Sequence, residues 1–253
     1  MLIVGFERFY NLIIQKFNYL EFANSFSHYL HPMKREIIQT ADGSNTIYIP
    51  EMDENYHSTH GALQEALHVF IKNGLELKKD LSQLDIFEMG FGTGLNALLS
   101  FIEAEKGKQH ISYKGIEAYP VEPELIQAIR YEDLVDERFH NGFQQMHELS
   151  WNEPHVLTSN FTFEKIHAKI EEYQVVQEQV DLVFYDAFGP KAQEAMWHPS
   201  ILKKMYDILK PNGTLVTYCA KGQVKRDLKA LGFTIESVPG PPGKREMTLA
   251  HKF

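Results

Sequence analysis

Cysteine is almost absent from this chain. Its 253 residues include a single cysteine, Cys219, which excludes a disulfide within the chain and any metal site built from several cysteines. The 12 histidines show no H-E-x-x-H or other metal-ligand spacing, so we expect no structural metal. A chain without disulfides suits a reducing compartment, and we therefore expect the protein in the cytoplasm.

Long hydrophobic runs are also missing. Residues 1–32 are rich in aromatic and aliphatic side chains, but charged residues interrupt every run, and none approaches the ~20 apolar residues that a membrane span needs. The basic region and small-residue cleavage site of a secretory signal are absent as well. Met33 opens a stretch typical of a native N-terminus. We expect residues 1–32 to be translated upstream sequence and residues 33–253 to form one domain; a genuine N-terminal helical extension is the alternative.

Positive charge is scarce except near the C-terminus. The formal net charge of −9 argues against indiscriminate binding to nucleic acid. Residues 203–253 nevertheless contain 10 lysines and arginines against 4 acidic residues. A basic C-terminal fifth on an acidic body permits a local contact with a polyanion, and a solvated surface is the alternative interpretation.

Strands and helices alternate through most of the sequence. Two short strands flank an Asp42-Gly43 turn, and residues 57–74 have the spacing of a helix that Ser58 or Thr59 can cap. We then expect strands at residues 84–89, 110–119, 180–188 and 213–220, followed by helices that begin at residues 95, 122, 199 and 222. This alternation predicts a mostly parallel sheet that helices cover on both faces.

The last two strands have no helix between them. Residues 233–238 and 246–253 are joined by a Pro/Gly loop too short for a crossover helix, so they must be antiparallel. A parallel sheet closed by a C-terminal antiparallel hairpin is typical of the class I S-adenosylmethionine-dependent methyltransferases, which have a Rossmann-like α/β fold. A dinucleotide dehydrogenase normally continues with βαβ units instead.

Three glycines alternate between a strand that ends at Met89 and a helix from Leu95. Such a turn brings backbone amides and a helix N-terminus against a ligand, but NAD, FAD and S-adenosylmethionine sites all use it. Glu88 precedes the first glycine, and a carboxylate there disfavours phosphates and favours a cationic ligand. We therefore predict S-adenosylmethionine as the cofactor. The predicted cofactor-binding residues are Glu88, Gly90, Phe91, Gly92, Thr93, Gly94, Asn96, Glu117 and Asp186.

Glu117 and Asp186 each end a predicted strand. Glu117 lies close to the spacing of about 20 residues at which an acid accepts both ribose hydroxyls, although a surface carboxylate is the alternative. Asp186 opens the segment Asp-Ala-Phe-Gly-Pro, a variant of the (Asp/Asn)-Pro-Pro-aromatic loop of amino-group methyltransferases. There it could orient an amine and take its proton, or merely cap the next helix. We expect Trp197 to pack beneath this loop.

Several stretches together resemble the MnmC-like methyltransferase family. They are "YHSTHGALQEALHVFI", "EMGFGTGLNALL", "DLVFYDAFGPKAQEAMWHPSIL", "GTLVTYCAKGQVKRDLKALGF" and "GKREM", in the family's order over roughly residues 34–253. The resemblance implies N-methylation of the aminomethyl group of 5-aminomethyl(-2-thio)uridine at the wobble position of tRNA. The larger relatives continue into an FAD-dependent oxidase domain that has no counterpart in this sequence, so we expect the stand-alone methyltransferase form.

One departure from the family concerns the adenine. Relatives have a Gly-Asp pair after the third strand. This sequence reads "FTFEKIHAKI" there, with His167 at the position where the acid is expected.

The tRNA substrate that the resemblance implies gives the basic C-terminus a role, because phosphate contacts need only point charges near the active-site mouth. The predicted substrate-binding residues are Tyr56, Phe188, Pro190, Lys221, Lys225, Arg226, Lys229, Lys244 and Arg245.

Three other functions share parts of this pattern. Lys221, Lys225 and Lys229, at i, i+4 and i+8, form a basic stripe on one face of the predicted C-terminal helix. A small-molecule methyltransferase, or an aminopropyltransferase of the spermidine-synthase kind, has the same fold but does not require this stripe. A non-catalytic tRNA-binding protein could keep the fold, yet Glu117 and Asp186 are both present. An NAD-dependent dehydrogenase is disfavoured by Glu88 and by the closing hairpin.

Overall fold

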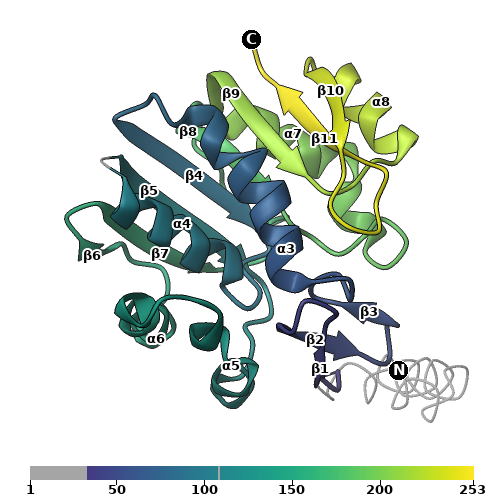
Figure 1. The fold of residues 1–253 in the computed structure, drawn as a ribbon. Helices are drawn as coiled ribbons and strands as arrows, with labels where there is room; N and C mark the ends of the chain where they lie inside the picture. Colours follow the sequence, from purple (N-terminus) through teal and green to yellow (C-terminus); the bar gives the residue numbers. More distant parts are fainter. Residues whose placement is uncertain (1–32, 108) are drawn as a thin grey trace, which may run out of the picture.

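The computed structural model describes residues 33–107 and 109–253. The extension expected at residues 1–32 lies outside the described residues. The centre of the fold is an eight-stranded sheet in the order β10-β11-β9-β8-β4-β5-β7-β6 (Figure 1). Its strands are β4 (Gln83–Met89), β5 (His110–Glu117), β6 (His155–Thr158), β7 (Phe161–His167), β8 (Val180–Tyr185), β9 (Leu209–Thr217), β10 (Thr234–Pro239) and β11 (Glu246–His251).

The five middle strands are parallel, as the alternation of elements predicted. β11 pairs antiparallel with β9, and β10 pairs antiparallel with β11. The C-terminal antiparallel hairpin and the class I methyltransferase fold are therefore confirmed. At the other edge β6 pairs antiparallel with β7, and neither this hairpin nor the helix before it was predicted from the sequence.

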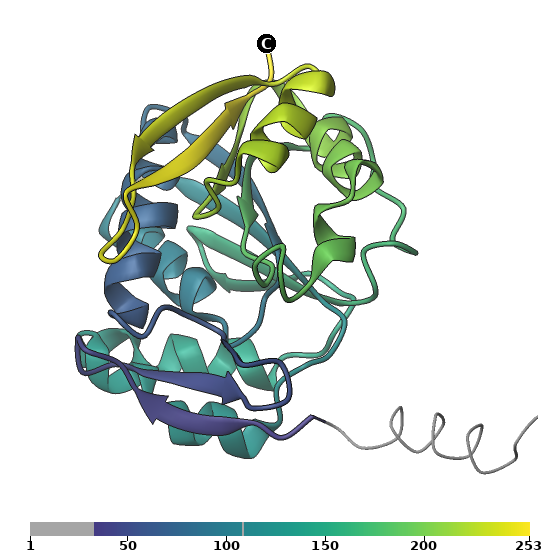
Figure 2. The same cartoon turned by 90° about the vertical axis from the view of Figure 1, so that its right-hand side faces the viewer.

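Helices cover both faces of the large sheet, and the side chains of each strand alternate between them. On β4, Ile86 packs in one core cluster with α3 and α4, whereas Phe87 and Met89 pack in a second cluster with α7 and α8. Figure 2 shows the two helical layers on opposite sides of the sheet. The helices are α3 (Ala62–Ala66), α4 (Leu95–Lys106), α5 (Pro123–Ile129), α6 (His140–Glu148), α7 (Pro199–Ile208) and α8 (Gly222–Ala230).

Shorter helical turns connect these elements. A π-helical segment, η1 (Leu67–Lys72), continues α3. Four 3₁₀ turns follow along the chain: η2 (Leu75–Lys78), η3 (Tyr131–Leu134), η4 (Glu137–Phe139) and η5 (Glu194–Trp197). None of the described helices has the length and apolar character required to cross a membrane.

A small second sheet lies beside the carboxyl end of the large one (Figure 1). It comprises β1 (Glu36–Gln39), β2 (Asn45–Ile49) and β3 (Glu54–Asn55), all antiparallel. The β1–β2 turn contains Gly43 at φ +85°, which confirms the predicted Asp42-Gly43 hairpin. Tyr56, which follows β3, lies against Gly92 of the glycine loop, so the small sheet lies next to this loop.

The start of α3 is capped differently from the prediction. Neither Ser58 nor Thr59 caps it; Gly61 precedes the helix at φ +149° without a side-chain cap of its own. The β1–β2 turn supplies the acceptors instead: Asp42 accepts from the Gln64 amide at 3.0 Å and Ser44 Oγ accepts from the Ala62 amide at 3.2 Å. The helix start is thus stabilised by a tertiary contact that local spacing does not reveal.

Asp42 provides a test of this contact. Partial burial acts to raise the pKa of its carboxyl, but hydrogen bonds from Ser44, Gln64 and Thr40 outweigh it and hold the pKa below its usual range. We expect Asp42→Ala to lower the free energy of unfolding by about 1–2 kcal/mol at neutral pH.

The stabilisation that the ionised Asp42 carboxylate gives to the folded protein is present above the ordinary carboxyl pKa of about 3.9. It disappears as pH falls through the lower pKa of Asp42 in the native state. Denaturant titrations at neutral and strongly acid pH measure it, with Asp80→Ala, an exposed aspartate, as the control. An equal loss at both pH values would contradict the capping role.

Candidate active site

A cavity of about 670 Å³ lies at the carboxyl ends of the parallel strands. Open α/β sheets bind ligands at this edge, where the strand order reverses. Its walls are the glycine loop after β4, the loops after β5, β7 and β8, and residues 49–59 of the small sheet and the segment that follows it. The predicted residues that line it are Tyr56, Gly90, Phe91, Gly92, Thr93, Asn96, Glu117, Asp186, Phe188 and Lys244.

The three glycines have left-handed backbone conformations and close neighbours. A Cβ at Gly90 (φ +93°) would come within 2.8 Å of the Asp186 carbonyl oxygen, and one at Gly92 (φ +52°) within 3.2 Å of the Tyr56 ring. At Gly94 (φ +77°) it would meet His147 Nε2 at 2.9 Å. Gly94 does not line the cavity. The backbone conformations and close neighbours within the protein are therefore sufficient to require glycine at these three positions.

Glu117 is held with its carboxylate at the cavity wall. Its Oε2 accepts from the Gly92 amide at 3.0 Å, and its Oε1 accepts from the Tyr119 amide at 2.8 Å. Each oxygen of an ionised carboxylate has a second acceptor position. Glu117 thus fixes the glycine loop and still has lone pairs for two hydroxyl groups, which fits the ribose of a nucleoside cofactor.

Glu88 differs from the sequence interpretation. Its side chain is fully buried and does not line the cavity, so it cannot contact a cationic ligand directly. Asn96 bridges Glu88 and Asp186: its Nδ2 donates to Glu88 Oε1 at 2.8 Å and to Asp186 Oδ2 at 2.8 Å. Burial raises the pKa of Glu88 well above its ordinary value, and the nearby Asp186 carboxylate raises it further. Burial thus favours the protonated, neutral form of Glu88.

Asp186 begins the loop after β8, and its carboxyl lines the cavity. Its amide donates to the Met89 carbonyl at 2.9 Å, which ties it to the end of β4. Burial raises the pKa of Asp186 to about 7, and the negative charge of Glu65 contributes. Asp186 does not cap the next long helix, α7, where His198 accepts from Ser200 instead. A carboxyl that exchanges its proton near neutral pH suits general acid–base chemistry.

The aromatic side chains of this loop pack as expected. Phe188 lies edge-on to Tyr56, with ring centroids 5.2 Å apart, and both line the cavity. Trp197 is buried beneath the loop and donates its indole hydrogen to the Phe188 carbonyl at 2.8 Å. Pro190 does not line the cavity. The two rings form an apolar wall beside Asp186.

The predicted basic residues separate into different environments. Lys244 lies inside the cavity, where its ammonium is 2.6 Å from Glu65. Lys225 is half-buried and pairs with Glu246 at 3.1 Å, so it does not belong to an open stripe. The other four predicted basic residues, Lys221, Arg226, Lys229 and Arg245, are exposed and lie outside the cavity.

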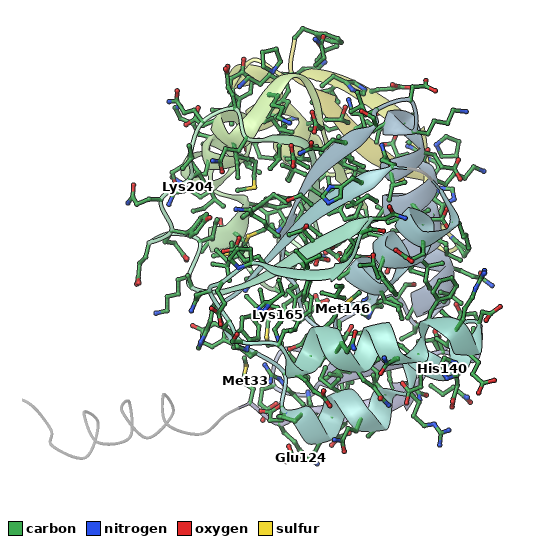
Figure 3. The ribbon with its side chains drawn as sticks, turned by 90° about the vertical axis from the view of Figure 1, so that its left-hand side faces the viewer. Met33, Glu124, His140, Met146, Lys165 and Lys204 are labelled. Atoms are coloured by element: carbon green, nitrogen blue, oxygen red, sulfur yellow. The ribbon has the colours of Figure 1, made fainter. Side chains whose placement is uncertain are left out.

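The loop after β7 forms the far end of the cavity. His167 is exposed and does not line it, whereas residues 168–171 do. Lys204 of α7, labelled in Figure 3, holds this loop. Its ammonium donates to the carbonyls of Ile170, Glu171 and Tyr173 at 2.7, 2.8 and 2.8 Å. The position at which an acid was expected, His167, therefore lies outside the cavity, and residues 168–171, which include the acidic Glu171, line it instead.

Two contributors to the site were not predicted. Glu65 lies on α3 and lines the cavity. The sequence showed only that Glu65 falls among the apolar residues of a predicted helix, not that it reaches the site. Arg35 lies in the segment before β1, and its guanidinium donates to the carbonyls of Tyr119 and Pro120 at 2.9 and 3.1 Å. It thereby fixes the loop that follows Glu117. Among the described residues, no cluster of His, Cys, Asp and Glu could hold a metal ion.

Comparison with known proteins identifies the fold and its cofactor. A family model described as S-adenosyl-L-methionine-dependent methyltransferase matches residues 127–253, half of the chain. The chain belongs to this family. S-adenosylmethionine is therefore the cofactor, in agreement with the glycine loop and Glu117, and an NAD-dependent dehydrogenase is excluded.

The methyltransferase is similar to a specific group of relatives. It is 30% identical over 230 residues to the tRNA 5-methylaminomethyl-2-thiouridine biosynthesis bifunctional protein MnmC of Cupriavidus metallidurans, covering 85% of this chain and 33% of that protein. It is also 30% identical to the protein of that name from Pseudomonas savastanoi pv. phaseolicola, with 78% and 32% covered. The chain spans about one third of the length of these curated relatives.

A solved structure gives the same relationship. The crystal structure of MNMC2 from Aquifex aeolicus superposes with a TM-score of 0.68 at 25% identity, covering 87% of this chain and 71% of that one. The resemblance to the MnmC-like methyltransferase family is confirmed. The comparisons do not favour an aminopropyltransferase or a non-catalytic protein.

Glu117 provides a test of the cofactor site. We predict that Glu117→Ala weakens the binding of S-adenosylmethionine by about 2–3 kcal/mol, roughly 30- to 150-fold, because charge-assisted hydrogen bonds to the ribose are lost. Titration calorimetry measures this affinity. Glu124→Ala removes an exposed carboxylate from the nearby helix α5 and should leave it unchanged. Unchanged affinity in Glu117→Ala would refute the ribose assignment.

Proposed function

We propose that this methyltransferase N-methylates the aminomethyl group of 5-aminomethyl(-2-thio)uridine at the wobble position of tRNA, in the cytoplasm. The observation that carries the proposal is a cavity in which Asp186 lies between the cofactor-binding loop and an apolar aromatic wall. The names of the MnmC relatives, which concern 5-methylaminomethyl-2-thiouridine biosynthesis, support the same chemistry.

The cofactor supplies an electrophilic methyl group, and the protein supplies position and a proton acceptor. Glu117 and the Gly92 amide, joined at 3.0 Å, hold the ribose end of the site. Asp186 attracts the acceptor ammonium, accepts its hydrogen bond and removes a proton, so that the nitrogen lone pair becomes available. Phe188 and Tyr56 pack against the uracil ring and orient the amine towards Asp186.

The exposed basic residues supply the tRNA contact. Lys221 lies at the start of α8, and Arg245 lies next to Lys244 in the loop before β11. Both are exposed, in contrast to Lys225 and Lys244, whose charges are paired within the protein. Contacts of Lys221, Arg226, Lys229 and Arg245 with phosphate oxygens position the tRNA without reading its sequence.

A direct assay tests this function. The protein is incubated with S-adenosylmethionine labelled in its methyl group and with tRNA that carries aminomethyl-uridine at the wobble position. We expect label in the tRNA and 5-methylaminomethyl-uridine among its digested nucleosides. Unmodified tRNA and free aminomethyl-uridine nucleoside are the controls. Equal methylation of the free nucleoside would indicate a small-molecule methyltransferase, and no transfer to the modified tRNA would overturn the proposal.

Asp186→Asn tests the proton acceptor, because it keeps the shape of the side chain and removes its charge. An aminomethyl nitrogen is largely protonated at neutral pH, as lysine is with a pKa of about 10.4. We expect turnover to fall about 10²–10⁴-fold and the rate to rise towards alkaline pH, where solution supplies the free amine.

In the unaltered protein, by contrast, kcat/KM should rise as pH passes the Asp186 pKa of about 7. Glu194→Gln removes an exposed carboxylate downstream in the chain and is the matched control. Near-normal turnover of Asp186→Asn at neutral pH would show that Asp186 only supports the loop.

A further inference from the structure

A second carboxylate shares the cavity with Asp186. Glu65 of α3 is 7% exposed, and both of its oxygens have partners. Its Oε2 accepts from the Ser58 amide at 2.8 Å, and its Oε1 accepts from the Lys244 ammonium at 2.6 Å. Glu65 therefore keeps a fixed position, with its carboxylate paired to the Lys244 ammonium.

Lys244 joins this carboxylate to the loop that carries Asp186. It lies in the β10–β11 loop, which reaches across to α3 in Figure 2. Its ammonium is 3.8 Å from the centre of the Tyr218 ring, a cation–π contact. The Tyr218 hydroxyl donates to the carbonyl of Ala187, the residue after Asp186, at 2.7 Å. The pair thus has defined positions relative to the proposed proton acceptor.

We propose that Glu65 is a positioning residue for Asp186: its fixed negative charge keeps the Asp186 carboxylate ready to take a proton from the acceptor ammonium at neutral pH, and Lys244 limits this effect. The proposal rests on the proposed function. In the step concerned, an N–H bond of the ammonium breaks and its electron pair stays on nitrogen. The proton forms an O–H bond on Asp186 and then passes to water.

The charges around Asp186 support this assignment. A like charge disfavours ionisation of a carboxyl, and an opposite charge favours it. After burial, Glu65 is the strongest influence that raises the pKa of Asp186, while Asn96 and Lys244 lower it. The titratable and polar groups that surround Asp186 are Glu65 from α3, Glu88 from β4, Asn96 from α4, Tyr113 from β5, Tyr131 from η3, Tyr218 after β9 and Lys244 from the β10–β11 loop.

The paired arrangement has a functional consequence. An aspartate with an ordinary pKa is a weak base for an ammonium, whereas one that titrates near the working pH is matched to the transfer. Without Lys244, the negative charge of Glu65 would act on Asp186 uncompensated, and the pKa of Asp186 would be higher. Glu65 and Lys244 therefore act on Asp186 in opposite directions.

Three variants test the proposal: Glu65→Gln, Lys244→Met and the double variant. The first readout is the carboxyl carbon NMR titration of Asp186 in the cofactor-free protein, assigned by its loss in Asp186→Asn. We expect the titration midpoint to fall by about 1 pH unit in Glu65→Gln, to rise by a similar amount in Lys244→Met, and to return close to the unaltered value in the double variant.

The second readout is the pH profile of kcat/KM with modified tRNA. Its acid limb should move in the same directions as the NMR midpoint, and the double variant should restore it. A merely structural role of Glu65 predicts instead that the double variant is at least as impaired as Glu65→Gln. Glu54→Gln removes another carboxylate of the same cavity, on β3, and should leave the Asp186 midpoint unchanged.

The outcomes separate the two proposals. An Asp186 midpoint that is the same in Glu65→Gln, Lys244→Met and the unaltered protein overturns the role of Glu65, whatever the substrate is. If Glu65→Gln does not fold, the double variant, which removes both charges of the pair, is compared with Lys244→Met: a lower Asp186 midpoint in the double variant supports the role of Glu65, and an equal midpoint overturns it. Midpoints that shift as expected, in a protein that does not methylate the modified tRNA, would support the charge pair and refute the substrate.

Discussion

The candidate active site depends on the side-chain amide of Asn96, which bridges the carboxyl groups of Glu88 and Asp186. Asn96 donates from the same nitrogen to Glu88 and to Asp186, each at 2.8 Å. Two adjacent carboxyl groups disfavour each other's ionisation. Burial adds to this effect at Glu88, which is fully enclosed under the glycine loop and whose pKa is raised well above its ordinary value. Asp186, which lines the cavity, is the carboxyl group that we propose exchanges its proton with the substrate.

This arrangement requires β4 and β8 to be neighbours, and the glycine loop serves that requirement. Met89 pairs with Tyr185, and the Asp186 amide bonds to the Met89 carbonyl at 2.9 Å. A side chain at Gly90 would press on the Asp186 carbonyl, and one at Gly92 would press on Tyr56. The glycines therefore let the acceptor loop and the small sheet approach the cofactor loop, which joins the two halves of the cavity.

The parts of the site that follow strand ends could be predicted from the sequence. Strand periodicity located Glu117 and Asp186, and the parallel alternation placed both at one edge of the sheet. The burial of Glu88 could not be predicted, because it depends on Asn96 packing over it from the next helix. The pairing of Glu65 with Lys244 joins residues 179 positions apart, and the capping of α3 by Asp42 also spans distant segments. Neither leaves a local pattern.

The cavity is lined mainly by acidic residues, whereas the surface outside it carries exposed basic residues. The proposed substrate has the complementary distribution of charge. Acidic residues outnumber basic ones among the residues that line the cavity: Glu54, Glu65, Glu117, Glu171 and Asp186 against Arg35, Lys169 and Lys244. An excess of carboxyl groups suits a single ammonium. On the surface, Lys221 and Arg245 are exposed and suit a polyanion. A nucleic acid that carries one amine presents both charges at once. Pairing Lys244 with Glu65 keeps the two regions separate, since an unpaired ammonium in the cavity would repel the amine that the phosphate contacts deliver.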